Sequence, residues 1–261
     1  MRLLLIRNLC SLLIVIFFAQ PMRGQGRQVV EDMRKVLAGR NFTALQSHID
    51  NLAGANWECL RDLTHDFREG VLVFGYVVKD KDNPDMGTEF TFRVNLVTTK
   101  TRIVYYQLSE RKYKKVLEDW KPYYQLMDEF KDSTAYKSLK SSFREIFHAE
   151  LNESELFLTN FVYGAHCGFV GTDPEERKQI DDFVSKRNKA HLVKWLQSTN
   201  TEKQVYAVDG LYQLKKFGMK LTEDELKMIR FVTGKKGSLC VCGGCIVRNE
   251  EIHDALMEFE F

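Results

Sequence analysis

The chain has 261 residues, of which 44% are hydrophobic and 28% are charged, and its formal net charge is +2. These are ordinary values for a globular protein, so we expect a folded chain throughout and not a disordered or low-complexity one. Lys and Arg (38) nearly balance Asp and Glu (36), which argues against a nucleic-acid-binding protein.

The first residues predict a signal peptide. Two arginines flank a short leading segment, and Leu9–Ala19 is then apolar apart from one serine. This run has the length of a secretory apolar region and is too short for a stable membrane span. We therefore expect residues 1–26 to be removed by cleavage near their end, and the protein to be secreted or periplasmic.

Removal of residues 1–26 would change the charge balance. The segment holds three arginines and no acid, so Lys and Arg would fall to 35 against 36 Asp and Glu, a net charge of −1. No later apolar stretch approaches the roughly 18 residues that a membrane span needs. The mature protein is expected to be soluble, without a transmembrane anchor and without an electrostatic surface for nucleic acid or anionic membranes.

Residues 27–112 are predicted to form a layer of helices and antiparallel sheet. Apolar residues recur at helical spacing over 28–66. Three following segments are rich in β-branched and aromatic residues, namely 71–80, 88–99 and 101–110. The sequence therefore predicts an α+β fold, in which N-terminal helices pack on a three-stranded antiparallel meander and a mostly helical C-terminal half follows.

That helical region is expected to cover residues 113–236. Its aromatic stretch, 120–130, is interpreted as a segment whose rings lie in the protein core. Capping residues place four helices further along the chain, near 174–186, 188–197, 201–217 and 222–233.

The stretch 191–218 resembles a helix pair of the HEAT repeat family. The resemblance rests on small residues and leucines in its second helix, which are Ala207, Val208, Gly210, Leu211 and Leu214. It implies two packed antiparallel helices that offer a binding face, and a plain helical hairpin is the alternative. A solenoid needs about three such units, and no second copy follows at a fixed period.

Five cysteines follow the leader, and three of them are close together in the C-terminal segment 237–261. The five are Cys59, Cys167, Cys240, Cys242 and Cys245. In an exported chain, we expect disulfides in which either Cys242 and Cys245 close a small ring or Cys167 clips the C-terminal segment to the helices. Two alternatives stay open: a zinc site made by these last four cysteines, with His166 as an extra ligand, and thiol–disulfide exchange between Cys242 and Cys245.

The sequence contains no metalloprotease, nucleophile-elbow, P-loop or dinucleotide motif. We therefore expect an exported, non-enzymatic binding or structural module stabilised by the C-terminal cysteine clip, with another protein as its candidate partner and no cofactor except zinc. The alternative is a metal-binding or thiol-redox protein that works through Cys240, Cys242 and Cys245. The third hypothesis is an enzyme whose residues are scattered along the chain, which a deep polar cleft would support.

Overall fold

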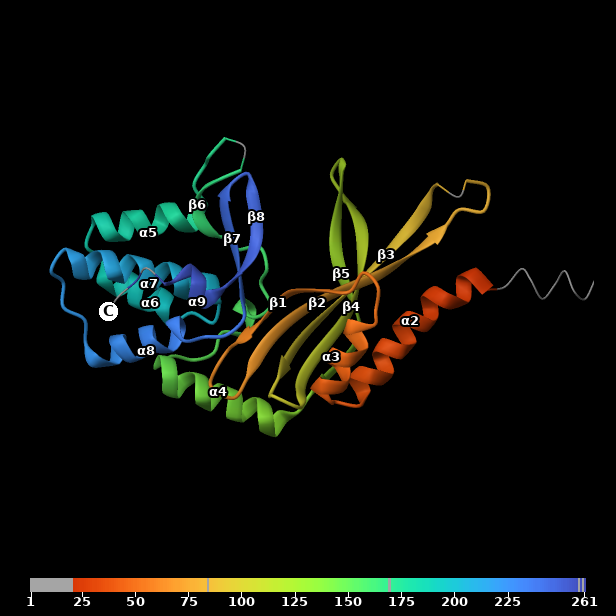
Figure 1. The fold of residues 1–261 in the computed structure, drawn as a ribbon, viewed down its shortest axis with the longest axis horizontal. Helices are drawn as coiled ribbons and strands as arrows, with labels where there is room; N and C mark the ends of the chain where they lie inside the picture. The colour runs from red at the N-terminus through yellow and green to blue at the C-terminus, as the bar shows by residue number, and fades with distance from the viewer. Residues whose placement is uncertain (1–20, 84, 169, 258, 260) are drawn as a thin grey trace, which may run out of the picture.

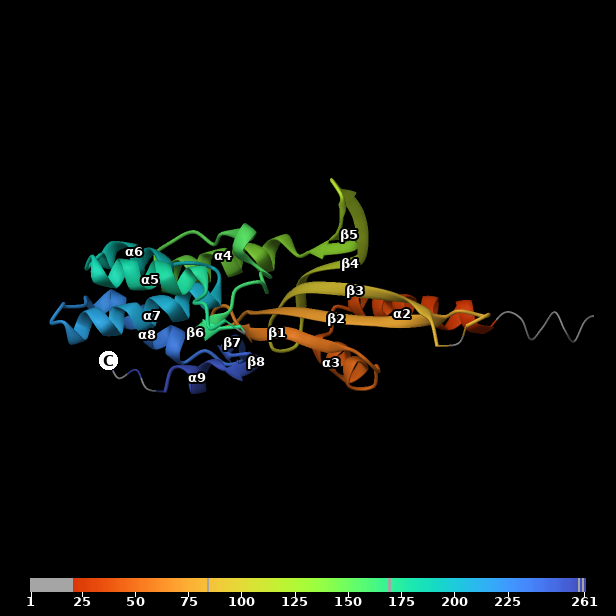
Figure 2. The same cartoon turned by 90° about the horizontal axis from the view of Figure 1, so that it is seen from above.

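The structure is a computed structural model that describes residues 21–261 except 84, 169, 258 and 260. The molecule is elongated, with a long antiparallel sheet towards one end and a group of helices with a small second sheet at the other (Figure 1, Figure 2). Most of the predicted signal peptide lies outside the described residues and stays a prediction. Its last residues begin helix α2 (Pro21–Ala38).

The first sheet has five antiparallel strands that follow the order of the chain. They are β1 (Asn56–Asp62), β2 (Arg68–Lys79), β3 (Gly87–Thr98), β4 (Ile103–Val116) and β5 (Asp119–Lys131). The register places large apolar side chains opposite one another, which stabilises the sheet. Phe74 pairs with Phe92, for example, and their ring centres lie 5.3 Å apart.

Alternation of side chains along these strands gives the sheet two apolar faces. Leu72 and Leu96 belong to the face that packs against the N-terminal helices, whereas Val71 and Val97 belong to the face that packs against the C-terminal helices. The helices that follow α2 along the chain and touch the sheet are α3 (Phe42–Asp50) and α4 (Ser133–Phe147). The sheet therefore contributes to both hydrophobic cores.

The predicted fold class is wrong, because the first sheet has five strands and not three, and the part of the chain after residue 111 is not a helical half. Both missed strands contain a β-bulge, which inserts one extra residue and interrupts the alternation. In β1 the bulge lies between Trp57 and Cys59, so Trp57 and Leu60 contact the same core at a spacing of three, as in a helix. In β5 the bulge lies opposite Leu108 and Ser109.

The C-terminal part holds helices around a second, three-stranded sheet. Its helices are α4, η1 (Glu153–Glu155), α5 (Glu175–Ser185), α6 (Lys189–Leu196), α7 (Thr201–Lys216), α8 (Glu223–Thr233) and α9 (Ile252–Ala255). The strands are β6 (Tyr163–Cys167), β7 (Ser238–Gly244) and β8 (Ile246–Glu251), with β6 parallel and β8 antiparallel to β7. The sequence analysis did not predict this sheet, because its strands are short and β6 and β7 contain glycines.

Helices α5 to α8 lie where the capping residues place them, although the caps differ in detail. At α8, Thr222 and Glu225 form a capping box, whereas Asn200 caps α7 by accepting a hydrogen bond from the Lys203 N–H. Helix α7 packs against α5, α6 and α8 and is buried along most of its length. Among the described residues, no helix is both long enough and apolar enough to cross a bilayer.

Candidate functional site

The cysteine cluster lies on the second sheet, where β6 runs beside β7. Cys167, at the end of β6, forms a disulfide with Cys242 of β7 across 75 residues of chain. Gly164 permits the close approach of these strands, because a Cβ at this position would lie 2.1 Å from the carbonyl oxygen of Cys242. The disulfide therefore ties the C-terminal strands to the strand that precedes α5.

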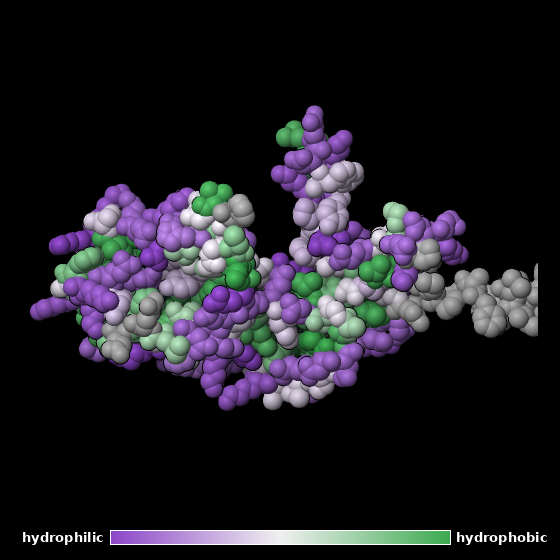
Figure 3. All heavy atoms as spheres, turned by 45° about the horizontal axis from the view of Figure 1, so that its top comes forward, coloured by the Kyte–Doolittle hydropathy of each residue, from purple (hydrophilic) through white to green (hydrophobic). Residues whose placement is uncertain are grey.

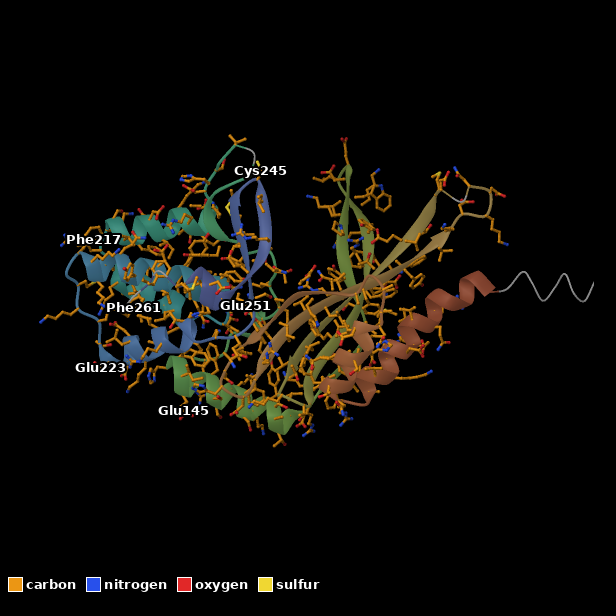
Figure 4. The ribbon with its side chains drawn as sticks, viewed as in Figure 1. Glu145, Phe217, Glu223, Cys245, Glu251 and Phe261 are labelled. Atoms are coloured by element: carbon orange, nitrogen blue, oxygen red, sulfur yellow. A yellow bond between two sulfur atoms is a disulfide. The ribbon has the colours of Figure 1, made fainter. Side chains whose placement is uncertain are left out.

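The other predicted site residues do not join this pair. Cys240 and Cys245 are free, and Cys245 is exposed at the outer end of the β7–β8 hairpin (Figure 4). The His166 side chain is largely exposed, and its Nδ1 lies 3.3 Å from Oδ1 of Asp173. In the part of the chain that the structure describes, no group of three or more His, Cys, Asp and Glu residues is arranged to hold a metal ion. The structure therefore gives no support to the predicted zinc site.

A hollow of about 210 Å³ lies between β1, β7, β8 and the start of α7, and two of the free cysteines line it. Burial raises the pKa of Cys59 to about 12. Burial, together with the negative charge of Glu202, also raises the pKa of Cys240. Both thiols are therefore protonated at neutral pH, and a protonated thiol is a poor nucleophile and a poor metal ligand.

Beside this hollow, three buried charges join the first sheet to α7. Arg61, on β1, is 1% exposed, and its guanidinium donates to Oε1 of Glu69 at 2.7 Å and to Oε1 of Glu202 at 2.5 Å. The Phe157 N–H donates to Oε2 of Glu69 at 3.2 Å, and the Asn200 amide donates to Oε2 of Glu202 at 3.1 Å. We call Arg61, Glu69 and Glu202 the ionic network. Each of its four carboxylate oxygens accepts one of these hydrogen bonds, and Glu202 also lines the hollow.

Lys235 lies next to the ionic network and forms no ion pair with a described carboxylate. Its ammonium donates to Oε1 of Gln204 at 2.7 Å. The rings of Phe147 and Phe231 lie 5.8 and 5.7 Å from its Nζ atom. Burial and then the positive charge of Arg61 lower the pKa of Lys235 to about 7. A large fraction of the folded molecules therefore holds this side chain neutral at physiological pH.

This depressed pKa predicts a pH-dependent stability. Between about pH 7 and 9, Lys235 is protonated in the unfolded chain, where its ordinary pKa is 10.5, but is increasingly neutral in the folded chain, so stability rises with pH. Relative to Lys235→Met, the wild-type free energy of unfolding should rise by about 2 kcal/mol over this range. Urea unfolding at several pH values measures the difference, and the exposed Lys227→Met serves as the control. A flat or falling difference would contradict the assignment.

The outer parts of β4 and β5 form a two-stranded projection, residues 109–126, which we call the arm. It stands clear of the rest of the molecule (Figure 1, Figure 3). Leu117 at its tip is 93% exposed, and Trp120 is 68% exposed. The other exposed apolar side chains of the arm are Tyr113, Val116, Tyr123, Tyr124 and Leu126. The prediction that the rings of 120–130 lie in the core is therefore wrong for most of them.

The register divides the arm into two faces, because directly paired residues of antiparallel strands lie on the same side. We call one the aromatic face, and its pairs are Lys115–Trp120, Tyr113–Pro122, Arg111–Tyr124 and Ser109–Leu126. We call the other the basic face, and its pairs are Val116–Asp119, Lys114–Lys121, Lys112–Tyr123 and Glu110–Gln125. Most of the aromatic residues of the arm thus lie on one face and most of its lysines on the other.

Several cations of the arm lack a carboxylate partner. Lys112 pairs with Glu110, but Lys114, Lys115 and Lys121 form no ion pair within the described residues. Lys114 and Lys121 also stand directly opposite each other, and like charges in this position destabilise a strand pair. Residues 114–121 hold these three lysines together with Glu118 and Asp119, so the outer half of the arm has a net charge of +1.

Comparison with family models, curated proteins and solved structures gives no match for this chain. Helices α6 and α7 pack against each other, and their similarity to a HEAT helix pair is limited to the short stretch 191–218. Of the features described above, the ionic network is buried and the thiols of the hollow are protonated. The arm is the feature among them whose aromatic and charged side chains are exposed to solvent.

Sequence reasoning missed both the ionic network and the arm. Nothing in the sequence pairs Arg61 with Glu202, since 141 residues separate them. Pro122 was the one residue that could have indicated the arm. A proline inside a helix costs about 3 kcal/mol, whereas a proline at the edge of a sheet is tolerated. That residue argues for an edge strand at 119–131.

Proposed function

We propose that this protein is an exported, non-enzymatic binding module that contacts its partner through the arm. The observation that carries the proposal is the aromatic face, where Trp120, Tyr113 and Tyr124 are exposed on one side of an isolated ribbon. Tryptophan, tyrosine and arginine are the residues that dominate the energy of binding surfaces, and exposed patches of this kind mark contact sites.

The exposed backbone of the outer strand of the arm is a less suitable binding surface than the side chains of the aromatic face. β5 is the outer strand of the sheet, and an unprotected outer strand can pair with strands of other molecules. Here Pro122 removes one backbone donor, and the bulge opposite Leu108 and Ser109 interrupts the ladder. These features oppose strand addition and leave the side chains of the aromatic face as the binding groups.

Site-specific photocrosslinking tests the proposal. A photoreactive phenylalanine analogue is placed at Trp120 or Tyr113, and the variants are illuminated in the cells that make the protein. Phe217 is the matched control, because it is 63% exposed but lies at the end of α7, away from the arm. We expect a discrete protein or lipid adduct from both arm positions and none from the control.

Equal labelling at all three positions would show unspecific contact and contradict the proposal. Absence of an adduct at both arm positions, with intact secreted protein recovered, would also contradict it. The two arm positions are paired to neighbouring residues of the same face, so a true contact should label both.

A further inference from the structure

Resting on this proposed function, we propose that the partner of the arm is a bilayer surface containing anionic phospholipids. Leu117 and Trp120 enter the headgroup region, and Lys114, Lys115 and Lys121 contact lipid phosphates. The observations that point to this partner are the conformation of the tip, the kind of rings behind it, and the charge left without a counterion.

The residue at the tip has a backbone conformation and an apolar side chain that are both unfavourable in a surface turn. Leu117 has φ of +57°, in the left-handed region that favours glycine or asparagine, and its side chain is 93% exposed. Leucine at this position does not suit the backbone conformation and does not pack into the protein core. A bulky apolar residue at this position is advantageous where a partner buries it, and strained residues of this kind are common at contact sites.

The residues behind the tip match the membrane interface. Tryptophan and tyrosine favour the headgroup level, because each ring has an apolar body and one polar group, and Trp120 and Tyr113 lie on the aromatic face just behind Leu117. Lysine side chains can reach phosphates while their methylene groups stay in the apolar zone. Phosphates would also relieve the repulsion between Lys114 and Lys121.

The shape and charge of the arm allow this contact. Figure 3 shows the arm as a narrow projection with a hydrophobic patch near its end, so a flat surface can reach the tip without meeting the rest of the molecule. Residues 109–126 contain five cations and three carboxylates. Two of these carboxylates, Glu118 in the turn and Asp119 at the start of β5, oppose binding to anionic lipid, so the contact is moderate and weakens with salt.

Single-stranded nucleic acid would also use exposed aromatic rings and lysines, but it would leave Leu117 in water. A protein with an apolar pocket would cover Leu117. If that pocket were basic, it would be attracted by Glu118 and Asp119 and would bind less well after their neutralisation, whereas an anionic partner would bind better. Neutralising those two carboxylates should therefore strengthen binding to an anionic partner and weaken binding to a cationic one.

Vesicle binding tests the inference. The full chain and its variants are sedimented with vesicles of phosphatidylcholine alone or mixed with phosphatidylglycerol, at low and high salt. All variants share residues 1–26, so any contribution of that segment is common to them. Lys114→Gln with Lys121→Gln should weaken binding to the mixed vesicles by more than tenfold, since each lysine contributes about fivefold. Glu118→Gln with Asp119→Asn should strengthen it.

Leu117→Gly separates binding from folding. Glycine relieves the left-handed conformation, so thermal stability should hold or rise while vesicle affinity falls several-fold. The β2–β3 hairpin offers matched controls: Met86→Gly, whose side chain is 63% exposed, and Lys79→Gln with Lys81→Gln. These should leave vesicle binding unchanged.

Absence of binding to the mixed vesicles, equal binding to pure phosphatidylcholine, or equal losses in the β2–β3 controls would each overturn the inference. A protein adduct from the crosslinking positions combined with no vesicle binding would overturn the lipid partner and leave the binding module standing. Failure of both experiments would remove both proposals.

Discussion

Replacement of Arg61 by methionine should lower the free energy of unfolding by about 3–5 kcal/mol, because it leaves two carboxylates buried without their cation. Glu69 and Glu202 are 1% and 2% exposed, so water cannot replace the guanidinium. Urea unfolding followed by circular dichroism measures the loss. The control is Arg144→Met, which removes an exposed pair with Glu150 and should leave the free energy of unfolding almost unchanged.

The charge explanation can be separated from a loss of packing. Adding Glu69→Gln and Glu202→Gln to Arg61→Met removes both stranded charges while amide oxygens remain for the Phe157 N–H and the Asn200 amide. This triple variant should regain more than half of the lost stability, since neutral buried groups cost less than unpaired charges. A triple variant as unstable as Arg61→Met would show that the arginine acts through its volume.

Loss of the disulfide should have the next largest effect. Cys167→Ser removes a bond that closes 75 residues of chain, and the loop-entropy model assigns about 3–5 kcal/mol to a loop of this length. The measurement is the free energy of unfolding under non-reducing conditions. Wild type in the presence of reductant should show a similar loss.

Cys245→Ser is the control for this change. It removes an exposed thiol three residues from Cys242 and should leave stability within about 0.5 kcal/mol of wild type. Equal stability of wild type and Cys167→Ser would mean that Cys167 and Cys242 are not bonded in the folded protein. Loss of stability in Cys245→Ser instead would indicate a different pairing.

The sequence allowed some strands to be predicted and concealed others. β3 alternates without interruption from Phe90 to Leu96, so its pattern is visible. In β1, the bulge beside Trp57 imposes a helix-like spacing on the apolar residues, and β5 carries both a bulge and Pro122. The spacing of apolar residues fails to predict a strand where a bulge adds one residue, because the side chains after the bulge lie on the other face.

The candidate site was less accessible to sequence reasoning than the helices. The helix ends were visible because capping depends on residues three or four positions apart, such as Thr222 and Glu225. Burial of Glu202 and exposure of Trp120 depend instead on which elements pack together, and no local pattern encodes that. The sequence also gives no sign that Lys114 and Lys121 are neighbours, and only the strand register shows that they stand opposite each other.

The ionic network also affects the time course of biosynthesis. Arg61 and Glu69 leave the ribosome within seconds of each other, but Glu202 follows Arg61 by 141 residues, which at typical rates of about 5–20 residues per second takes roughly 7–28 s. During this interval Arg61 has only one of its two carboxylate partners, and the sheet face that belongs to the C-terminal core is not yet covered by all of its helices. A nascent chain of this protein therefore has a long period in which it requires protection by chaperones or prompt export, and messages truncated before α7 should yield products that are degraded.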